Sequence, residues 1–246
     1  MHKYFEHSGC RIAYHQLDGG GPGIVFLGGF KSDMAGTKAL FLQDYAKANG
    51  HAFLRFDYSG HGHSSGEFLD GCIGDWARDA MAVITALTKG PQVLVGSSMG
   101  GWIALLIARE MPAKLAGLIG IAAAPDFTED SMWAGFNKDQ RAQILKGGQV
   151  ALPSEYAQEP YIITRKLIED GRKHLVLRDP LKLPFPTRFL QGDADRDVDI
   201  SVPLRLLSHA QGPDIRLTFV KGADHRFSSL QSLALLQQTL DEVLSK

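Results

Sequence analysis

The chain alternates short, nearly all-apolar runs with longer segments whose apolar residues recur at helical spacing, and this limits its fold most strongly. Such runs suit parallel strands, which are covered by helices on both faces and joined by helical crossovers. Candidate strands are residues 23–28, 52–57, 92–96, 115–123, 187–191 and 215–220. Candidate helices are residues 37–49, 73–87, 101–111, 202–211 and 230–245. The sequence therefore predicts an α/β fold with a mostly parallel central sheet flanked by helices.

Two segments depart from this pattern. Residues 10–17 alternate apolar and polar side chains, so we expect them in an antiparallel entry hairpin at the sheet edge. The interval 125–186 is too long for a simple crossover, and we predict a mostly helical cap inserted into the sheet domain. An insertion above the carboxyl ends of strands is well placed to form a substrate pocket. With 246 residues, the whole chain (1–246) is expected to form one domain.

One serine has the context of a catalytic nucleophile. The pattern Gly96-Ser97-Ser98-Met99-Gly100 follows an apolar strand directly and opens an apolar helix, as the G-x-S-x-G nucleophile elbow does. A second match, Gly62-His63-Ser64-Ser65-Gly66, runs into loop composition with no helix start. A serine before a helix is also a common N-cap, but the glycines around Ser98 exceed what a cap requires. We predict Ser98 as the nucleophile.

The partners of such a serine follow it in the chain as an acid and then a histidine. His225 lies just after the last candidate strand and before the last helix, so we predict it as the general base. The loop after strand 187–191 offers four carboxylates, and Asp195 fits the spacing of strand, Gly192, two residues, Asp and then an apolar residue at Val198. We predict Asp195 as the acid. The alternatives are Asp193 and Asp197, and unused carboxylates of this loop are expected to cap the next helix or to face solvent.

A tetrahedral intermediate requires two backbone N–H donors. We assign one to Met99, the residue after the nucleophile, and the other to Phe30, in the glycine-rich loop that follows strand 23–28. The pair His61 and His63 has the H-x-H spacing of some metal ligands. These histidines fall within an R-x-D-x-x-G-x-G-x-S pattern, residues 55–64, so we interpret them as part of a structural turn and predict no metal site.

Composition narrows the class of partner and the compartment. The 26 Lys and Arg residues nearly balance the 27 Asp and Glu residues, and this balance offers no field that favours nucleic acid or an anionic membrane. The two cysteines are too few for a disulfide framework, and the N-terminal residues contain no apolar signal region. We therefore expect a cytoplasmic enzyme whose substrates are small molecules or acyl groups. The oligomeric state stays open.

These motifs resemble the α/β-hydrolase superfamily across almost the whole chain. Within it, the chain is similar to the mitochondrial palmitoyl-protein thioesterases that also act as acyl-glucuronide esterases. The resemblance rests on four marks, which are Gly36-Thr37-Lys38-Ala39, Arg55-Phe56-Asp57-Tyr58-Ser59-Gly60, Gly96-Ser97-Ser98-Met99-Gly100-Gly101-Trp102 and Asp224-His225-Arg226. It implies a triad of Ser98, Asp195 and His225 and the hydrolysis of thioesters or activated esters without a cofactor.

Two other functions are weighed against this one. A non-catalytic protein that binds small ligands on the same fold would have lost turnover, and the complete triad argues against it. An aminopeptidase would need carboxylates in the cap to hold the substrate amine, for which Glu129, Asp130, Glu155 and Glu159 are available. Solvation on helix surfaces is the simpler role for these four.

Overall fold

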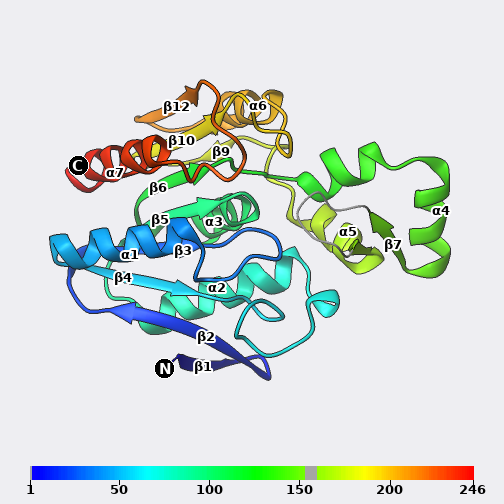
Figure 1. The fold of residues 1–246 in the computed structure, drawn as a ribbon, viewed down its shortest axis with the longest axis horizontal. Helices are drawn as coiled ribbons and strands as arrows, with labels where there is room; N and C mark the ends of the chain where they lie inside the picture. The colour runs from blue at the N-terminus through cyan, green and yellow to red at the C-terminus, as the bar shows by residue number, and fades with distance from the viewer. Residues whose placement is uncertain (1, 153–159) are drawn as a thin grey trace.

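An eight-stranded, mostly parallel sheet forms the centre of the computed structural model, which describes residues 2–152 and 160–246. The strand order is β1-β2-β4-β3-β5-β6-β10-β12, and Figure 1 shows the sheet between two layers of helices. The strands β1 and β2 pair antiparallel at one edge, and β2 pairs antiparallel with β4. The other neighbours are parallel. The predicted fold class and the entry hairpin are both confirmed.

The sheet strands are β1 (Lys3–His7), β2 (Cys10–Leu17), β3 (Gly20–Leu27), β4 (His51–Phe56), β5 (Gln92–Ser97), β6 (Leu115–Ile121), β10 (Thr187–Gly192) and β12 (Ile215–Val220). The helices that pack on the sheet are α1 (Thr37–Asn49), α2 (Ile73–Leu87), α3 (Met99–Glu110), α6 (Ser201–His209) and α7 (Leu230–Leu244). Two short 3-10 turns are η1 (Phe68–Asp70) and η2 (Pro112–Lys114). The two-residue strands β9 (Leu181–Lys182) and β11 (Ala210–Gln211) pair with each other in parallel, outside the main sheet.

Each face of the sheet has its own apolar core. On one face, α1 and α7 bury Leu42 and Leu236 against Val93 and Val95 of β5. On the other face, α2 and α3 bury residues such as Trp76 and Trp102. Figure 1 shows the two helix layers separately, with α1 and α7 in front of the sheet. The central strands are covered on both sides, which accounts for their almost continuous apolar sequences.

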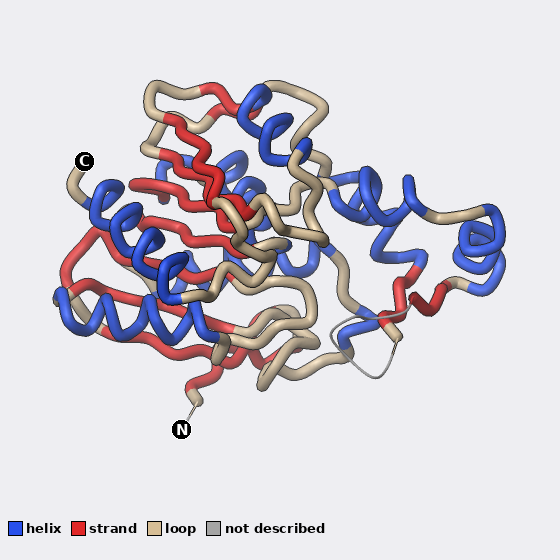
Figure 2. The backbone as a smooth tube through the Cα atoms, turned by 45° about the horizontal axis from the view of Figure 1, so that its top comes forward, coloured by secondary structure: helices blue, strands red, loops and turns tan. Residues whose placement is uncertain are grey.

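The interval 125–186, called the insertion below, extends beyond the end of the sheet toward which β4 points (Figure 1). It contains a π-helical turn η3 (Thr128–Trp133), α4 (Lys138–Gly147), β7 (Gln149–Leu152), β8 (Tyr161–Thr164), α5 (Arg165–Gly171) and a 3-10 turn η4 (Arg172–His174). The antiparallel pair β7–β8 was not expected in a helical insertion. Its strands are only four residues long, too short for a reliable period-two pattern. Figure 2 shows this pair as the strands that lie apart from the main sheet.

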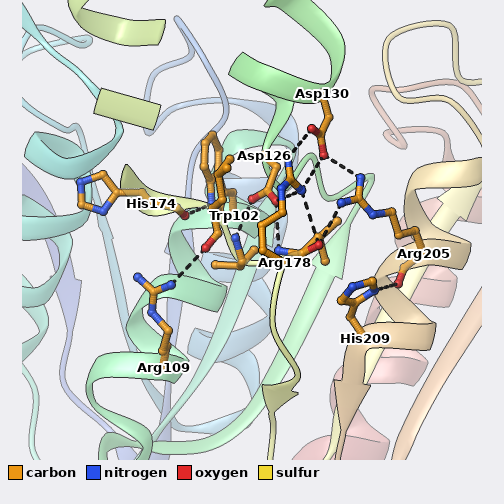
Figure 3. A network of polar contacts seen from close by, with 11 residues as sticks. Trp102, Arg109, Asp126, Asp130, His174, Arg178, Arg205 and His209 are labelled. Carbon is orange, nitrogen blue, oxygen red and sulfur yellow. Dashed lines mark hydrogen bonds and ion pairs between the residues drawn. The ribbon is translucent and has the colours of Figure 1, made fainter. Parts of the chain in front are cut away.

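A buried carboxylate joins the two ends of the insertion. Asp126 is fully buried and accepts hydrogen bonds from the backbone N–H groups of Val176 (2.8 Å) and Leu177 (3.0 Å). Arg178 bonds to Asp126 and also to Asp130 of η3, and Asp130 pairs with Arg205 of α6 at 2.6 Å. Figure 3 shows this network converging between the insertion and α6. The start and end of the insertion are therefore fixed to each other and to the sheet domain.

Candidate active site

Ser98 stands in a strained turn between β5 and α3. Its backbone has φ 54° and ψ −118°, a region that residues with a side chain rarely adopt. Its amide donates to Ile121 O at 2.9 Å, so the turn is tied to the neighbouring strand β6. Ser98 occupies the N-cap position of α3, but its side chain makes no capping hydrogen bond. The simple N-cap interpretation of Ser98 is therefore wrong, and the hydroxyl is free to face another group.

The glycines around Ser98 are required by close packing. A Cβ at Gly96 would lie 2.3 Å from Gly100 O, and one at Gly101 would lie 2.6 Å from the Cβ of Ala123. Side chains at these positions would separate α3 from β5 and β6. The sequence pattern of small residues thus corresponds to direct contact between helix and strand backbones.

The three predicted catalytic side chains form one chain of hydrogen bonds. Nε2 of His225 lies 3.1 Å from Ser98 Oγ, and Nδ1 of His225 lies 2.9 Å from Oδ2 and 3.1 Å from Oδ1 of Asp195. Ser98 follows β5, Asp195 follows β10, and His225 follows β12. The carboxyl ends of these parallel strands meet at one edge of the sheet, which brings together residues far apart in the chain.

Asp195 has the environment of an ionised carboxylate. Its side chain is only 1% exposed. Burial alone would raise its pKa, but hydrogen bonds from His225 and from the N–H groups of Val198 and Asp197 outweigh burial and hold the pKa below its usual value. Gln191 adds a further bond from Nε2 to Oδ2 at 2.8 Å. This role of Gln191 was not predicted, although a glutamine at the end of a buried strand is a visible signal.

The other candidate acids have different partners. Asp193 bonds to Lys221 at 2.6 Å and to the N–H of Gly222 at 2.5 Å, which joins two loops. Asp199 accepts bonds from the backbone and side chain of Ser201 at the start of α6. Asp197 lies nearer, with Oδ2 4.0 Å from His225 Nδ1, but its side chain is 37% exposed. Asp195 is therefore the carboxylate that is both buried and bonded to the imidazole.

Asp195, Asp197 and His225 also place potential metal-ligand atoms within 4.8 Å of one another. The Nδ1 atom of His225 is already engaged by Asp195. We therefore interpret these three residues as a hydrogen-bonding group and assign no metal to them.

The serine of the second G-x-S-x-G match and the histidine His61 of the H-x-H pair both make contacts that stabilise the fold. Ser64 Oγ donates to Asp57 O at 2.6 Å and accepts from the Ala13 N–H at 2.8 Å, so it connects the loop after β4 to strand β2. His61 is buried, and its ring packs edge-on against Phe68 and Trp76. Burial lowers the pKa of His61 to about 4, so the ring is neutral at physiological pH. His61 thus belongs to an aromatic cluster.

The loop after β3 is held next to the nucleophile by two charged residues from the end of β4. Asp57 accepts the N–H of Met34 at 2.6 Å, and Arg55 donates to Met34 O at 2.6 Å. Both side chains are at least nine-tenths buried. At the start of the same loop, a Cβ on Gly29 would lie 3.5 Å from the Cβ of Ser98. The predicted architectural role of the R-x-D turn is confirmed, because it fixes the loop that carries Phe30.

A cavity of about 490 Å³ opens at Ser98 and His225. Its lining from the insertion is mainly apolar and comprises Phe127, Ser131, Met132, Leu152, Tyr161 and Ile163. The polar lining comes from the loop before α1, the first turn of α1, the loop after β10 and the histidine loop, and comprises Ser32, Asp33, Thr37, Lys38, Asp197 and Arg226. Phe30 packs edge-on against Phe127 of the insertion, with ring centroids 5.8 Å apart. The cavity is thus shared between the sheet loops and the insertion.

The insertion carboxylates proposed for an aminopeptidase are used elsewhere. Glu129 pairs with Arg172 at 2.6 Å, and Asp130 pairs with Arg178 and Arg205. The described carboxylates of the insertion do not line the cavity. Glu155 and Glu159 lie outside the described residues. The expectation that Glu129 and Asp130 are merely solvated is wrong, because both are bound by arginines.

The arrangement of Ser98, Asp195 and His225 at strand ends is that of an α/β-hydrolase, and comparison with known families agrees. A family model described as "Serine aminopeptidase, S33" matches residues 23–165. The chain therefore belongs to this family of α/β-hydrolases.

Relatives that match nearly the whole chain narrow the family further. The palmitoyl-protein thioesterase ABHD10, mitochondrial, of Rattus norvegicus is 36% identical over 236 residues, which cover 96% of this chain and 79% of the relative. The solved structure of α/β-hydrolase domain-containing protein 10 from mouse has a TM-score of 0.92 at 33% identity and covers 100% of this chain and 98% of its own. A putative hydrolase from Agrobacterium vitis S4 has a TM-score of 0.95 at 37% identity, with 99% and 98% covered.

Proposed function

We propose that this chain is a serine hydrolase that cleaves carboxylic esters or thioesters through an acyl-enzyme on Ser98. The observation that carries the proposal is the chain of contacts from Ser98 Oγ to His225 Nε2 and from His225 Nδ1 to Asp195. The palmitoyl-protein thioesterase names of the mammalian relatives support the same reaction class.

In the proposed reaction, His225 takes the hydroxyl proton as Ser98 Oγ attacks the acyl carbon. Asp195 stays ionised and holds the imidazole so that Nδ1 keeps its proton and Nε2 accepts. The protonated His225 then gives its proton to the departing alcohol or thiol. Water hydrolyses the acyl-enzyme by the same proton transfers, which restores Ser98.

Backbone N–H groups of Met99 and Phe30 are proposed to stabilise the oxyanion. Met99 is the first residue of α3, where the N–H groups have no partner within the helix. Phe30 follows the glycine that passes beside Ser98. Two donors that converge on the carbonyl oxygen of the substrate would stabilise the developing charge, and one such donor is typically worth about 10²-fold to 10³-fold in rate.

The insertion is proposed to act as a cap that selects the acyl group within a single functional unit of residues 1–246. Its apolar lining suits an acyl chain, while the polar residues near Arg226 suit the leaving group. The substrate is then an acylated small molecule or an acyl-protein. An aminopeptidase is disfavoured, because Glu129 and Asp130 are bound by arginines and do not reach the cavity.

A cytoplasmic location is also proposed. Both cysteines are free thiols, as is usual in a reducing compartment. Within residues 2–152 and 160–246, no helix is both long enough and apolar enough to cross a membrane. The mammalian relatives carry the word mitochondrial in their names, so imaging of a tagged protein in its own cell is the direct test.

The central experiment measures hydrolysis of p-nitrophenyl esters of graded chain length beside acyl thioesters, for the wild type and Ser98→Ala. We expect turnover to fall to the background rate in Ser98→Ala. A fluorophosphonate probe should label the wild type and not the variant. A folded wild type without labelling would instead favour a non-catalytic binding protein, and undiminished turnover in Ser98→Ala would remove the nucleophile assignment.

A further inference from the structure

Lys38 lines the catalytic cavity, and the proposed reaction gives it no role. It lies in the first turn of α1, in the segment Gly36-Thr37-Lys38-Ala39. Its ammonium donates a hydrogen bond to the backbone carbonyl of Arg226, the residue directly after His225. The contact joins residues 188 positions apart.

Local helix energetics do not explain a lysine at this position. The positive end of the helix dipole lies at the N-terminus, so a cation in the first turn is unfavourable. Gly36 occupies the N-cap, and no side chain caps the helix. The ammonium is also half-buried, and burying an alkyl ammonium costs free energy unless it is well bonded. We therefore attribute the presence of a lysine at position 38 to its contact with the Arg226 carbonyl.

Two bonds within the histidine loop hold this point: the Phe227 N–H donates to Asp224 Oδ1 at 3.0 Å, and Ser228 Oγ donates to the Arg226 carbonyl at 2.9 Å. Lys38 is a donor to the same carbonyl from outside the loop. Phe227 has φ 49°, a strained value for a bulky residue, and its side chain is fully buried. The Arg226 carbonyl thus lies between His225 and a strained residue. A donor fixed on α1 limits how far that peptide can move.

The helix that presents Lys38 is itself firmly placed. It buries Ala39, Leu42, Tyr45 and Ala46 on the sheet. Near its other end, the Tyr45 hydroxyl donates to Asp241 of α7 at 2.5 Å. Helix α1 is therefore bonded to the C-terminal part of the chain at two points, Arg226 and Asp241. The bond from Lys38 to Arg226 is the one nearer to the His225 imidazole.

We propose that Lys38 is a positioning residue, which holds the His225 loop through the Arg226 carbonyl and so keeps Nε2 in line with Ser98 Oγ. This inference rests on the proposed hydrolase function for its kinetic readout only. A misplacement of about 1 Å at a reacting group costs on the order of 10²-fold in rate.

The protonation state of Lys38 offers a second readout. Burial lowers the pKa of Lys38 to about 8, Asp224 opposes this shift, and Arg226 adds to it. Asp33 and Asp197 line the same cavity. Above about pH 8 the bond to Arg226 loses its charge assistance and weakens, so kcat should decline in the wild type. An arginine keeps its charge throughout this range.

The test compares the wild type, Lys38→Met and Lys38→Arg, with the Ser98→Ala rate subtracted at each pH. We expect Lys38→Met to lower kcat for a short p-nitrophenyl ester about 10-fold to 100-fold, with KM changed less than about threefold. Lys38→Arg should keep kcat within about threefold and lose the decline above about pH 8. A change confined to KM, wild-type kcat in Lys38→Met, or an unchanged decline in Lys38→Arg would overturn the proposal.

A measurement without substrate separates this proposal from the hydrolase assignment. The downfield proton resonance of His225 Nδ1–H, identified by its loss in His225→Gln, reports the bond to Asp195. It should broaden or disappear in Lys38→Met and return in Lys38→Arg. An unchanged resonance in folded Lys38→Met refutes the positioning role even if the protein hydrolyses no ester. Should Lys38→Met fail to fold, the pH comparison of the wild type with Lys38→Arg still decides.

Discussion

Replacement of Gly100 by alanine tests whether the closeness of α3 to β3 sets the position of the nucleophile. A Cβ at Gly100 would lie 2.1 Å from Leu27 O and 2.6 Å from Gly28 O. Both are backbone atoms of β3 and the loop after it, so neither can turn away as a flexible side chain would. The helix or the oxyanion loop must therefore move.

The size of the effect follows from these contacts. Ordinary van der Waals contact begins at about 3.5 Å, so the pair Cβ and Leu27 O has to separate by more than about 1 Å. Overpacking of this kind typically costs about 1–3 kcal/mol in the free energy of unfolding, and contact with backbone favours the upper end. A shift of about 1 Å at the elbow also predicts a loss of about 10²-fold in rate.

The matched control is Gly147→Ala, in α4 of the insertion, where a new Cβ would meet nothing within 4 Å. Gly147 is the last residue of α4, where alanine gains less than the advantage of about 1 kcal/mol that it has over glycine in a helix interior, so this variant should be at least as stable as the wild type and fully active. Urea unfolding and initial rates with a short p-nitrophenyl ester measure both quantities. If Gly100→Ala matched the wild type in stability and rate, the packing argument for the elbow would be wrong.

Three further predictions concern single side chains. Asp195→Asn should fold normally and lose about 10⁴-fold in kcat, because the amide favours the wrong tautomer of His225; a loss below tenfold would contradict its assignment. Ser64→Ala should keep its esterase activity yet unfold about 2 kcal/mol more easily, since its hydroxyl bridges strand β2 and the loop after β4; loss of turnover in a folded variant would reopen Ser64 as nucleophile. Burial raises the pKa of Asp170, but hydrogen bonds from His174, the Gly74 N–H and Cys72 outweigh burial and bring it to about 2. A carboxylate with a lowered pKa stabilises the fold above its unfolded value and loses this contribution as pH falls through the folded value. Asp170→Asn should therefore be about 2 kcal/mol less stable at pH 7, and urea titrations should show this difference shrinking between about pH 4 and pH 2; a difference independent of pH would contradict the linkage.

The sheet and its strand ends could be predicted because each depends on local sequence. The predicted strand 215–220 has the same bounds as the observed strand β12, and the predicted strand 92–96 is one residue shorter than the observed strand β5. Strands covered on both faces have apolar residues at nearly every position, and the turn after each strand has its own pattern. Ser98 and Asp195 follow strands of this kind, so their positions could be predicted from local sequence. His225 follows the edge strand β12, which has no buried residue, and its position was predicted from its place between the last strand and the last helix.

The insertion could not be predicted in the same detail because long-range contacts hold it. Asp126 bonds to Val176, 50 residues later in the chain, and Asp130 bonds to Arg205, 75 residues later. No local sequence pattern predicts which residues so far apart in the chain will pair. Gln191 is an intermediate case, since its position in a buried strand was visible and its partner Asp195 was not.

The local contacts of the sheet and the long-range contacts of the insertion position different parts of the site. The reacting groups depend on the sheet, whose strand ends fix them through backbone geometry that tolerates little change. The acyl side of the cavity depends on the insertion, whose attachment lies in the Asp126 and Asp130 network (Figure 3). Because Asp130 is bonded to α6, the helix that follows the Asp195 loop, the insertion is fastened to the part of the sheet domain that supplies the acid. We then expect substrate preference to vary through side chains such as Tyr161 and Met132 while the proposed catalytic hydrogen-bond chain stays unchanged.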